Sequence, residues 1–257
     1  MDRIVLAYSG GPSSSVAIPW LREQQQAEVV TVSVDLGQHE SLDGIRARAL
    51  ASGAVRAHVL DRRDEFAREY LLPAIESGAL DSDAPAIVAA LSRPLIAKAL
   101  VELAHIEGAT AVAHAATGPQ DRERLATAVA ALDPTLRVID ATVDWTFDAQ
   151  GMAEYARERG IPFAAPSATP DPLAAVKADA AAHPIFVHLD FRGGVPVKIN
   201  GIEMDLVELM ASLETIADAQ ATSGAAVLRA AYGAKQSGVP ADVKIFKGVC
   251  EVVTRGN

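Results

Sequence analysis

The chain has 257 residues, half of them hydrophobic, which is enough for one large domain or for a main domain with a smaller one. Its 33 acidic and 23 basic residues give a formal net charge of -10, which argues against a nucleic acid or an anionic membrane surface as the main partner. A single cysteine excludes a disulfide within the chain, and no apolar run has the roughly 18 residues of a membrane helix, so we expect a cytoplasmic globular protein.

The first part of the chain alternates short apolar runs with helical patterns, which predicts β-α-β units on a parallel sheet. The expected strands are 4–7, 29–34, 55–60, 109–114 and 137–141. The expected helices are 14–26, 41–52, 64–77, 86–107, a helix ending at 131, and 152–159. Pro19 and Pro94 fall within two of these helices and should kink, shorten or divide them, because proline lacks the N–H that bonds to the preceding turn.

Residues 162–172 are rich in alanine and proline, which indicates a connection between domains. Beyond it we expect a helix over 173–182, a hairpin of strands 184–189 and 195–199, a helix over 204–220 and a strand over 243–254. The predicted fold class is therefore α/β, with a parallel-sheet, Rossmann-like nucleotide-binding domain at residues 1–165. A smaller α+β domain follows at residues 166–257.

The first apolar run leads into a loop rich in glycine and serine that opens a helix. Gly10 and Gly11 allow the backbone to approach a ligand closely, and four hydroxyls lie near helix N–H groups. These hydroxyls belong to Ser9, Ser13, Ser14 and Ser15. No lysine follows as in a Walker loop, so a phosphate would be held by amides and hydroxyls. The alternative is a plain strand-to-helix turn with a serine N-cap.

Two further polar segments, Asp35–Gln38 and Thr117–Arg124, also follow expected strands. In open parallel sheets, ligands bind beyond the carboxyl ends of the strands, where such segments converge. This convergence favours the phosphate site over the plain turn.

Four segments carry a family resemblance. They are Ala7-Tyr-Ser-Gly-Gly11, Val34-Asp-Leu-Gly-Gln38, Ser92-Arg-Pro-Leu-Ile-Ala-Lys98, and Ala113-His114 followed by Thr117-Gly118. In order and spacing they resemble argininosuccinate synthase, a family of N-type ATP pyrophosphatases. The resemblance covers most of residues 1–165 and extends more weakly into residues 193–201 and the helix that follows.

The resemblance implies ATP as cofactor, normally with Mg²⁺, and a ligase reaction. In that family a citrulline oxygen attacks the α-phosphate, pyrophosphate leaves, and the aspartate amine displaces AMP. The implied nucleotide-binding residues are Ala7, Tyr8, Ser9, Gly10, Gly11, Ser13, Ser14, Ser15, Val34, Asp35, Gln38, Arg93 and His114. The implied substrate-binding residues are Thr117, Gly118, Gln120, Asp121 and Arg124, of which Asp121 and Arg124 are the catalytic candidates. The family assembles through its second lobe, so we expect a homo-oligomer.

The chain departs from the family in the phosphate loop, where the family has Ser-Gly-Gly-Leu-Asp-Thr-Ser. Ser13 stands at the aspartate position, and a hydroxyl is a much poorer ligand for a hard cation than a carboxylate. Mg²⁺-assisted cleavage of ATP would then require Asp35 or Asp121 as a substitute. We assign no residue as a metal ligand.

Two other segments also depart. Where the family has Arg-Tyr-Pro-Leu-Gly-Thr at the citrulline site, Pro85 and Ala89 replace the tyrosine and the threonine, so we expect a substrate other than citrulline. The family's aspartate-binding segment is one residue longer and has a lysine that this chain lacks. Each retained residue also has a structural alternative: His114 as a strand-end residue, Arg93 in an ion pair, and Thr117 as a helix cap.

Three hypotheses remain open from the sequence. The first is an ATP-dependent ligase that adenylates an oxygen of a small molecule and transfers it to an amine, with aspartate as a candidate. The second is a protein that binds a nucleotide without catalysis, and the third is a structural or partner subunit with an empty loop.

Overall fold

The computed structural model describes residues 2–37, 42–81, 84–145, 149–162, 183–234 and 240–253. The chain divides into two compact units: Met1–Arg63 with Ala89–Ser167, and Asp64–Val88 with Ala168–Asn257. The boundary expected after residue 165 does not anticipate that Asp64–Val88 packs with the C-terminal part of the chain.

The first unit contains a five-stranded parallel sheet. Its strands are β1 (Arg3–Ala7), β2 (Glu28–Asp35), β3 (Arg56–Asp61), β4 (Ala111–His114) and β5 (Arg137–Asp140), in the order β3-β2-β1-β4-β5. All four pairs of neighbouring strands are parallel. The predicted Rossmann-like α/β architecture is therefore confirmed.

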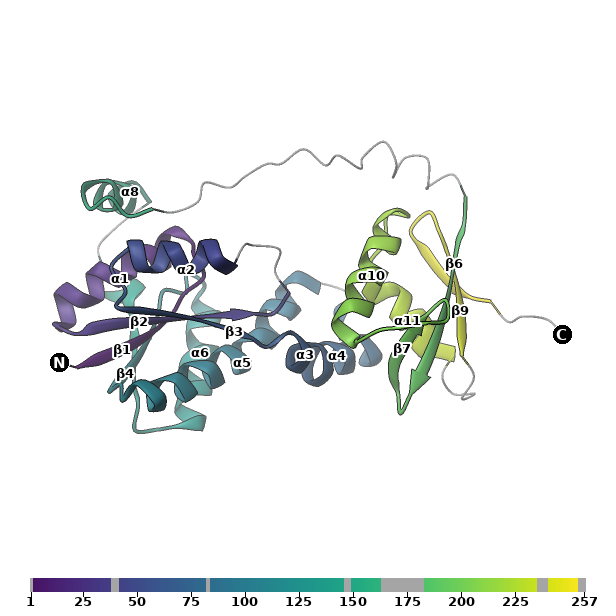
Figure 1. The fold of residues 1–257 in the computed structure, drawn as a ribbon, viewed down its shortest axis with the longest axis horizontal. Coiled ribbons are helices and arrows are strands. Elements are labelled where there is room, and N and C mark those ends of the chain that lie inside the picture. The colour runs from purple at the N-terminus through teal and green to yellow at the C-terminus, as the bar shows by residue number, and fades with distance from the viewer. Residues whose placement is uncertain are drawn as a thin grey trace. The chain divides into compact units, whose positions relative to one another are not determined.

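Helices cover both faces of this sheet (Figure 1). The helices are α1 (Pro12–Gln25), α2 (Leu42–Ala51), α5 (Ala84–Glu107), α6 (Pro119–Leu132), α7 (Ala141–Asp144) and α8 (Ala149–Glu158). Because side chains alternate along a strand, Ile4 and Leu6 of β1 pack into the core beneath α1 and α2, whereas Val5 packs into the core beneath α5 and α6. The sequence expectation contains no helix corresponding to α7.

Both helices that contain an internal proline continue past it. Pro19 lies inside α1 and Pro94 inside α5, so the expected helices 14–26 and 86–107 are confirmed, and neither proline divides its helix. A proline in a helix interior costs about 3 kcal/mol because a backbone hydrogen bond is lost. Buried neighbours offset that cost, since Leu21 and Leu95 are both fully buried.

The second unit contains an antiparallel sheet of order β10-β9-β6-β7-β8. Its strands are β6 (Ile185–Arg192), β7 (Val195–Ile199), β8 (Ile202–Glu203), β9 (Ala241–Phe246) and β10 (Val249–Val252). Two helices, α10 (Leu206–Asp218) and α11 (Gly224–Ala234), contribute to its apolar core. The same core includes residues of a π-helical turn (Ala67–Leu71), α4 (Leu72–Ser77) and a 3₁₀ turn (Ala79–Asp81), which follow the short helix α3 (Arg63–Phe66). The predicted smaller α+β domain is confirmed as a fold.

The C-terminal strands of the second unit differ from the sequence expectation. The single strand expected over 243–254 is wrong, because β9 and β10 pair as a hairpin that turns at Lys247 and Gly248, both with positive φ. The helix expected over 173–182 lies outside the described residues. Among the helices that the structure does describe, none is both long and apolar enough to cross a bilayer.

Candidate active site

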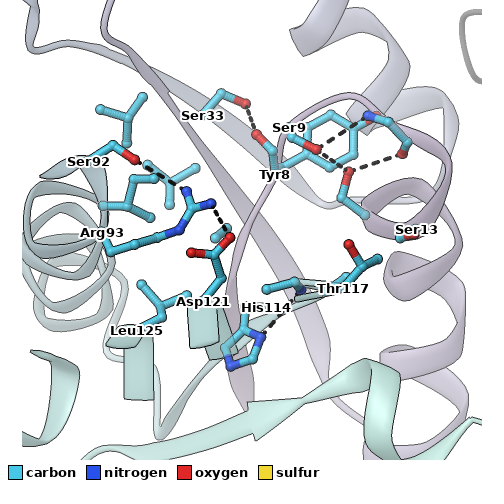
Figure 2. A pocket seen from close by; sticks show the side chains of 18 of the residues that line it. Tyr8, Ser9, Ser13, Ser33, Ser92, Arg93, His114, Thr117, Asp121 and Leu125 are labelled. Carbon is cyan, nitrogen blue, oxygen red and sulfur yellow. Dashed lines mark hydrogen bonds and ion pairs between the residues drawn. The ribbon is translucent and has the colours of Figure 1, made fainter. Parts of the chain in front are cut away.

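A cavity of about 540 Å³ lies at the carboxyl edge of the parallel sheet (Figure 2). Its walls come from the segments that follow β1, β2 and β4 and from side chains of α2, α5 and α6. The three polar segments singled out from the sequence therefore meet at one place, as strand order predicts.

Most of the expected site residues line this cavity. From the nucleotide-binding set these are Ala7, Tyr8, Ser9, Gly11, Ser13, Ser14, Val34, Arg93 and His114, and from the substrate-binding set Thr117 and Asp121. Gly10, Ser15, Asp35, Gly118, Gln120 and Arg124 are not among the lining residues. Gln38 lies outside the described residues.

The glycine loop ends at the first turn of α1. Gly11 is the N-cap, with no side-chain cap, so the alternative of a serine N-cap is wrong. The first intrahelical bond joins Ser15 N to Gly11 O at 3.0 Å. The N–H groups of Ser13 and Ser14 precede this bond, and both residues line the cavity. A helix start of this kind attracts an anion.

The hydroxyls of the loop bond to one another. Ser14 Oγ donates to Gly11 O at 3.1 Å and lies 3.2 Å from Ser9 Oγ. Because a hydroxyl has one proton, Ser9 is the donor in the second contact. The buried pair Tyr8 Oη and Ser15 Oγ is 3.0 Å apart. These bonds fix the loop, and Ser13 Oγ faces Met152 Sδ, a weak acceptor, at 3.9 Å.

The residues present do not fit a magnesium ion held by the protein. Asp35 Oδ1 accepts from Gly37 N at 2.9 Å, and its Oδ2 lies 3.3 Å from Nε of Arg63. Both oxygens of Asp121 also face arginines, so neither aspartate substitutes for the carboxylate missing at Ser13. Within the described ranges no three acidic, histidine or cysteine side chains gather as metal ligands.

Arg93 of α5 and Asp121 of α6 form an ion pair in the wall of the cavity. Arg93 Nη2 lies 2.8 Å from Asp121 Oδ2, and Nη1 donates to Ser92 Oγ at 3.2 Å. The hydrogen bond from Arg93 holds the pKa of Asp121 below its ordinary value. An ionised, hydrogen-bonded carboxylate is a poor general base at neutral pH, so this geometry suits Asp121 to positioning Arg93.

His114 ends β4 and is buried in the cavity wall. Burial lowers its pKa; Asp140, whose Oδ1 lies 3.8 Å from Nδ1, opposes this effect, and Arg122 and Arg93 reinforce it. Nδ1 also faces Ala116 N at 3.5 Å as an acceptor. The lowered pKa favours the neutral imidazole at pH 7, which brings a hydrogen-bonding group rather than a charge to the cavity wall.

The start of α6 differs from the helix-cap alternative. Its N-cap is Gly118 with no side-chain cap, so Thr117 is not the cap, and Pro119 and Asp121 occupy the first turn. Thr117 instead lines the cavity. Arg124 Nη1 lies 3.7 Å from Asp121 Oδ1, one helical turn away.

Several lining residues have no counterpart in the sequence expectation. Ser33 Oγ donates to Tyr8 O at 2.8 Å, and a polar residue within a buried strand is a signal that could have revealed it. Ile45, Ile96 and Leu125 supply apolar walls from three helices and carry no such signal. Ala89 is half-buried and does not line the cavity, and the side chain of Pro85 is outside the described part of the structure.

The family model and the curated relatives that match this chain both belong to the argininosuccinate synthase family. Residues 3–162 match the family model described as the arginosuccinate synthase N-terminal HUP domain. Argininosuccinate synthases from Streptococcus suis (strain 05ZYH33) and Caldanaerobacter subterraneus subsp. tengcongensis are each 36% identical to this chain over 245 residues. Those alignments cover 84% of this chain but 61% and 60% of the relatives, so the chain spans about three-fifths of their length.

A solved structure with a related arrangement is that of a predicted subunit of tRNA methyltransferase from Methanocaldococcus jannaschii. It is 13% identical, with a TM-score of 0.42, over 62% of this chain and 77% of that chain. No functional argument rests on a likeness of this size.

Proposed function

Because the chain belongs to the argininosuccinate synthase family, we propose that it binds ATP in the cavity at the carboxyl edge of the parallel sheet and activates a small molecule as an adenylate. The observation that carries this proposal is that Ser13 and Ser14, in the first turn of α1, line the same cavity as Arg93 and Thr117. An anion-binding helix start and a second polar wall are the two parts that such chemistry requires.

The proposed reaction has two steps. An oxygen of the small molecule attacks the α-phosphorus, the bond from that phosphorus to the bridging oxygen breaks, and pyrophosphate leaves with the electron pair. An amine then attacks the activated carbon, a C–N bond forms, and AMP leaves with the substrate oxygen while the amine loses a proton to solvent. The contribution of the protein is positioning and stabilisation of charge on the phosphates.

We assign roles to the residues around the cavity. The loop amides hold the phosphates, the neutral imidazole of His114 donates one hydrogen bond, and Thr117 with the Arg93–Asp121 pair faces the second substrate. The residues present do not fit a magnesium ion held by the protein, so the roles above belong to the protein's own groups.

For the second substrate we propose an amine that carries a carboxylate, with aspartate as the first candidate, because Thr117, Gly118 and Asp121 match the segment that holds aspartate in this family. For the activated molecule we propose a compound other than citrulline. In the family match Ala89 stands where the family has a threonine, and Ala89 neither carries a hydroxyl nor lines this cavity, so the hydrogen bond that discriminates for a polar substrate is lost.

A second candidate function is nucleotide binding without turnover. It is favoured by the serine at position 13 and by the arginines and the backbone amide that occupy the oxygens of Asp35 and Asp121. A protein of this kind would bind ATP and release it unchanged.

Two measurements test these proposals. In titration calorimetry we expect heat of binding with ATP, and no heat with either ATP or AMP would contradict both candidate functions. We then expect pyrophosphate release when ureido, amide and carboxylate compounds are supplied together with aspartate. Binding of ATP with no release across that panel would favour the second candidate over the ligase.

We also propose that the protein works as a homo-oligomer in the cytoplasm, as its family suggests. Light scattering coupled to size exclusion should give a mass of at least twice the 26.9 kDa of the chain. A mass equal to that of one chain at working concentration would contradict this proposal.

A further inference from the structure

The guanidinium of Arg48 lies next to Gly10, on the side where a side chain at that position would project. A β-carbon at this position would lie 2.6 Å from Nη2 of Arg48 and 3.4 Å from Cγ1 of Ile45, both on α2. The first distance is shorter than side-chain contacts allow, and φ of Gly10 is also positive, at 80°. The guanidinium of Arg48 is therefore seated directly against the loop.

Arg48 lies close to the cavity, because Ile45 of the same helix and two residues of the loop line it. Ile45 precedes Arg48 by three residues on the same face of α2, touches the same point of the loop, and lines the cavity. Ser9 and Gly11, on either side of Gly10, also line it. The guanidinium of Arg48 thus lies against a loop that borders the ligand space, although Arg48 is not itself among the residues that line the cavity.

The cavity wall carries little positive charge with which to compensate a triphosphate. The loop has neither the lysine of a Walker loop nor an aspartate that would hold a cation. Arg93 is paired with Asp121, and His114 is neutral, so the cavity wall itself adds little net positive charge. A triphosphate brings several negative charges into this space, and amide dipoles alone compensate them incompletely.

We propose that Arg48 is a positioning residue for phosphate, which stabilises the bound phosphates electrostatically through the Gly10 backbone. This inference rests on the proposed function, because it takes the cavity as the ATP site. It adds a cation from α2 to that site. It also gives a second reason why position 10 requires glycine, since a β-carbon there would clash with Arg48 as well as disfavour the positive φ. Its effect should grow with the number of phosphates on the ligand.

The test compares Arg48→Gln with Arg48→Lys and with Arg46→Gln. Arg46 is exposed on the same helix, so its variant is a matched removal of one charge. Affinities for ATP, ADP, AMP and adenosine are measured by titration calorimetry for each protein. We expect Arg48→Gln to weaken ATP binding about tenfold, with smaller losses for ADP and AMP and none for adenosine. Arg48→Lys should restore most of the ATP affinity, and Arg46→Gln should match the wild type.

The possible failures are distinguishable. A wild-type protein that binds none of the four ligands overturns the proposed function and this inference with it. Nucleotide binding by the wild type with equal ATP affinities in Arg48→Gln and Arg46→Gln overturns the inference alone. An equal loss for adenosine and ATP, or no recovery in Arg48→Lys, would mean that Arg48 supports the loop sterically, which also overturns it.

Discussion

The two edges of the parallel sheet use their polar residues in opposite ways. At the amino edge, Glu107 is buried at the end of α5 and lies 2.7 Å from Nη1 of Arg56 and 3.1 Å from Nε2 of His58. Arg3 donates to its carbonyl oxygen at 3.1 Å. At the carboxyl edge, serines of the first turn of α1 and Thr117 line a cavity.

The polar residues at the amino edge stabilise the fold, whereas those at the carboxyl edge line the cavity in which we propose that a ligand binds. A buried carboxylate is tolerated because three cationic or polar side chains bond to it, and removing it leaves those groups without their partner. Polar groups that line a cavity contribute less to folding and remain available to a ligand. We therefore expect substitutions at the amino edge to change stability and those at the carboxyl edge to change nucleotide affinity.

The largest effect is expected for Glu107→Gln at the amino edge. The free energy of unfolding, measured by urea denaturation, should fall by about 2 kcal/mol. The glutamine amide is uncharged and has a single oxygen, so it cannot accept the hydrogen bonds that Arg56 and His58 donate to the two carboxylate oxygens. Arg56 is half exposed, which keeps the loss below that of a fully buried pair. ATP affinity of the folded protein should not change, and a matching loss of affinity would break the division between the edges.

The same residue predicts a pH dependence of stability. Burial opposes ionisation of Glu107, but hydrogen bonds from Arg56 and His58 outweigh it and hold its pKa below the ordinary 4.5. The ionised carboxylate thus stabilises the fold fully above pH 4.5, and this contribution is lost as the pH falls through the lower folded pKa. Urea denaturation between pH 3 and 6 should show a flatter acid limb for Glu107→Gln than for the wild type, and equal slopes would contradict the assignment.

At the carboxyl edge, Gly10→Ala should weaken ATP binding by about tenfold or more, because the methyl group meets Arg48 and the dihedral angle disfavours alanine. Gly108→Ala is the matched control at the amino edge, since Gly108 also has positive φ but nothing lies within 4 Å of its added β-carbon. Both variants should lose about 1 kcal/mol of stability in urea denaturation. Equal ATP affinities in the two variants would refute the distinction.

A smaller effect is expected for the Arg93–Asp121 pair. The coupling energy from a double-mutant cycle of Arg93→Gln and Asp121→Asn should be about 1 kcal/mol, because both side chains are partly exposed. Affinity for an aspartate-like ligand in the presence of ATP should fall in both single variants. If Asp121→Asn keeps full affinity, Asp121 has no role in positioning Arg93 for a ligand.

The smallest effect is expected for Ser13→Asp, which restores the carboxylate of the family loop. ATP affinity in Mg²⁺ relative to EDTA should rise roughly threefold over the same ratio in the wild type. Ser14→Asp, one position further along the loop, serves as the comparison. An unchanged ratio in Ser13→Asp would mean that position 13 does not face the phosphates.

Sequence patterns predicted the parallel sheet and the meeting of three polar segments, because both depend on short-range periodicity and on strand direction. The boundaries of most elements agree within a few residues. The patterns predicted α1 and α5 through Pro19 and Pro94, where packing outweighs the local preference of proline. They failed at 243–254, where the turn at Lys247 and Gly248 divides one apolar run into two strands.

By itself, the sequence determined the family, the Rossmann-like fold and the place of the glycine- and serine-rich loop, since these depend on motifs that are contiguous in the chain. Only the tertiary structure decided which charged side chains lie beside the cavity and which partners they meet there. It pairs Arg93 with Asp121 across 28 residues and seats Arg48 against Gly10. These contacts depend on how helices pack on the sheet, and side chains so far apart in the chain leave no local pattern that would show them.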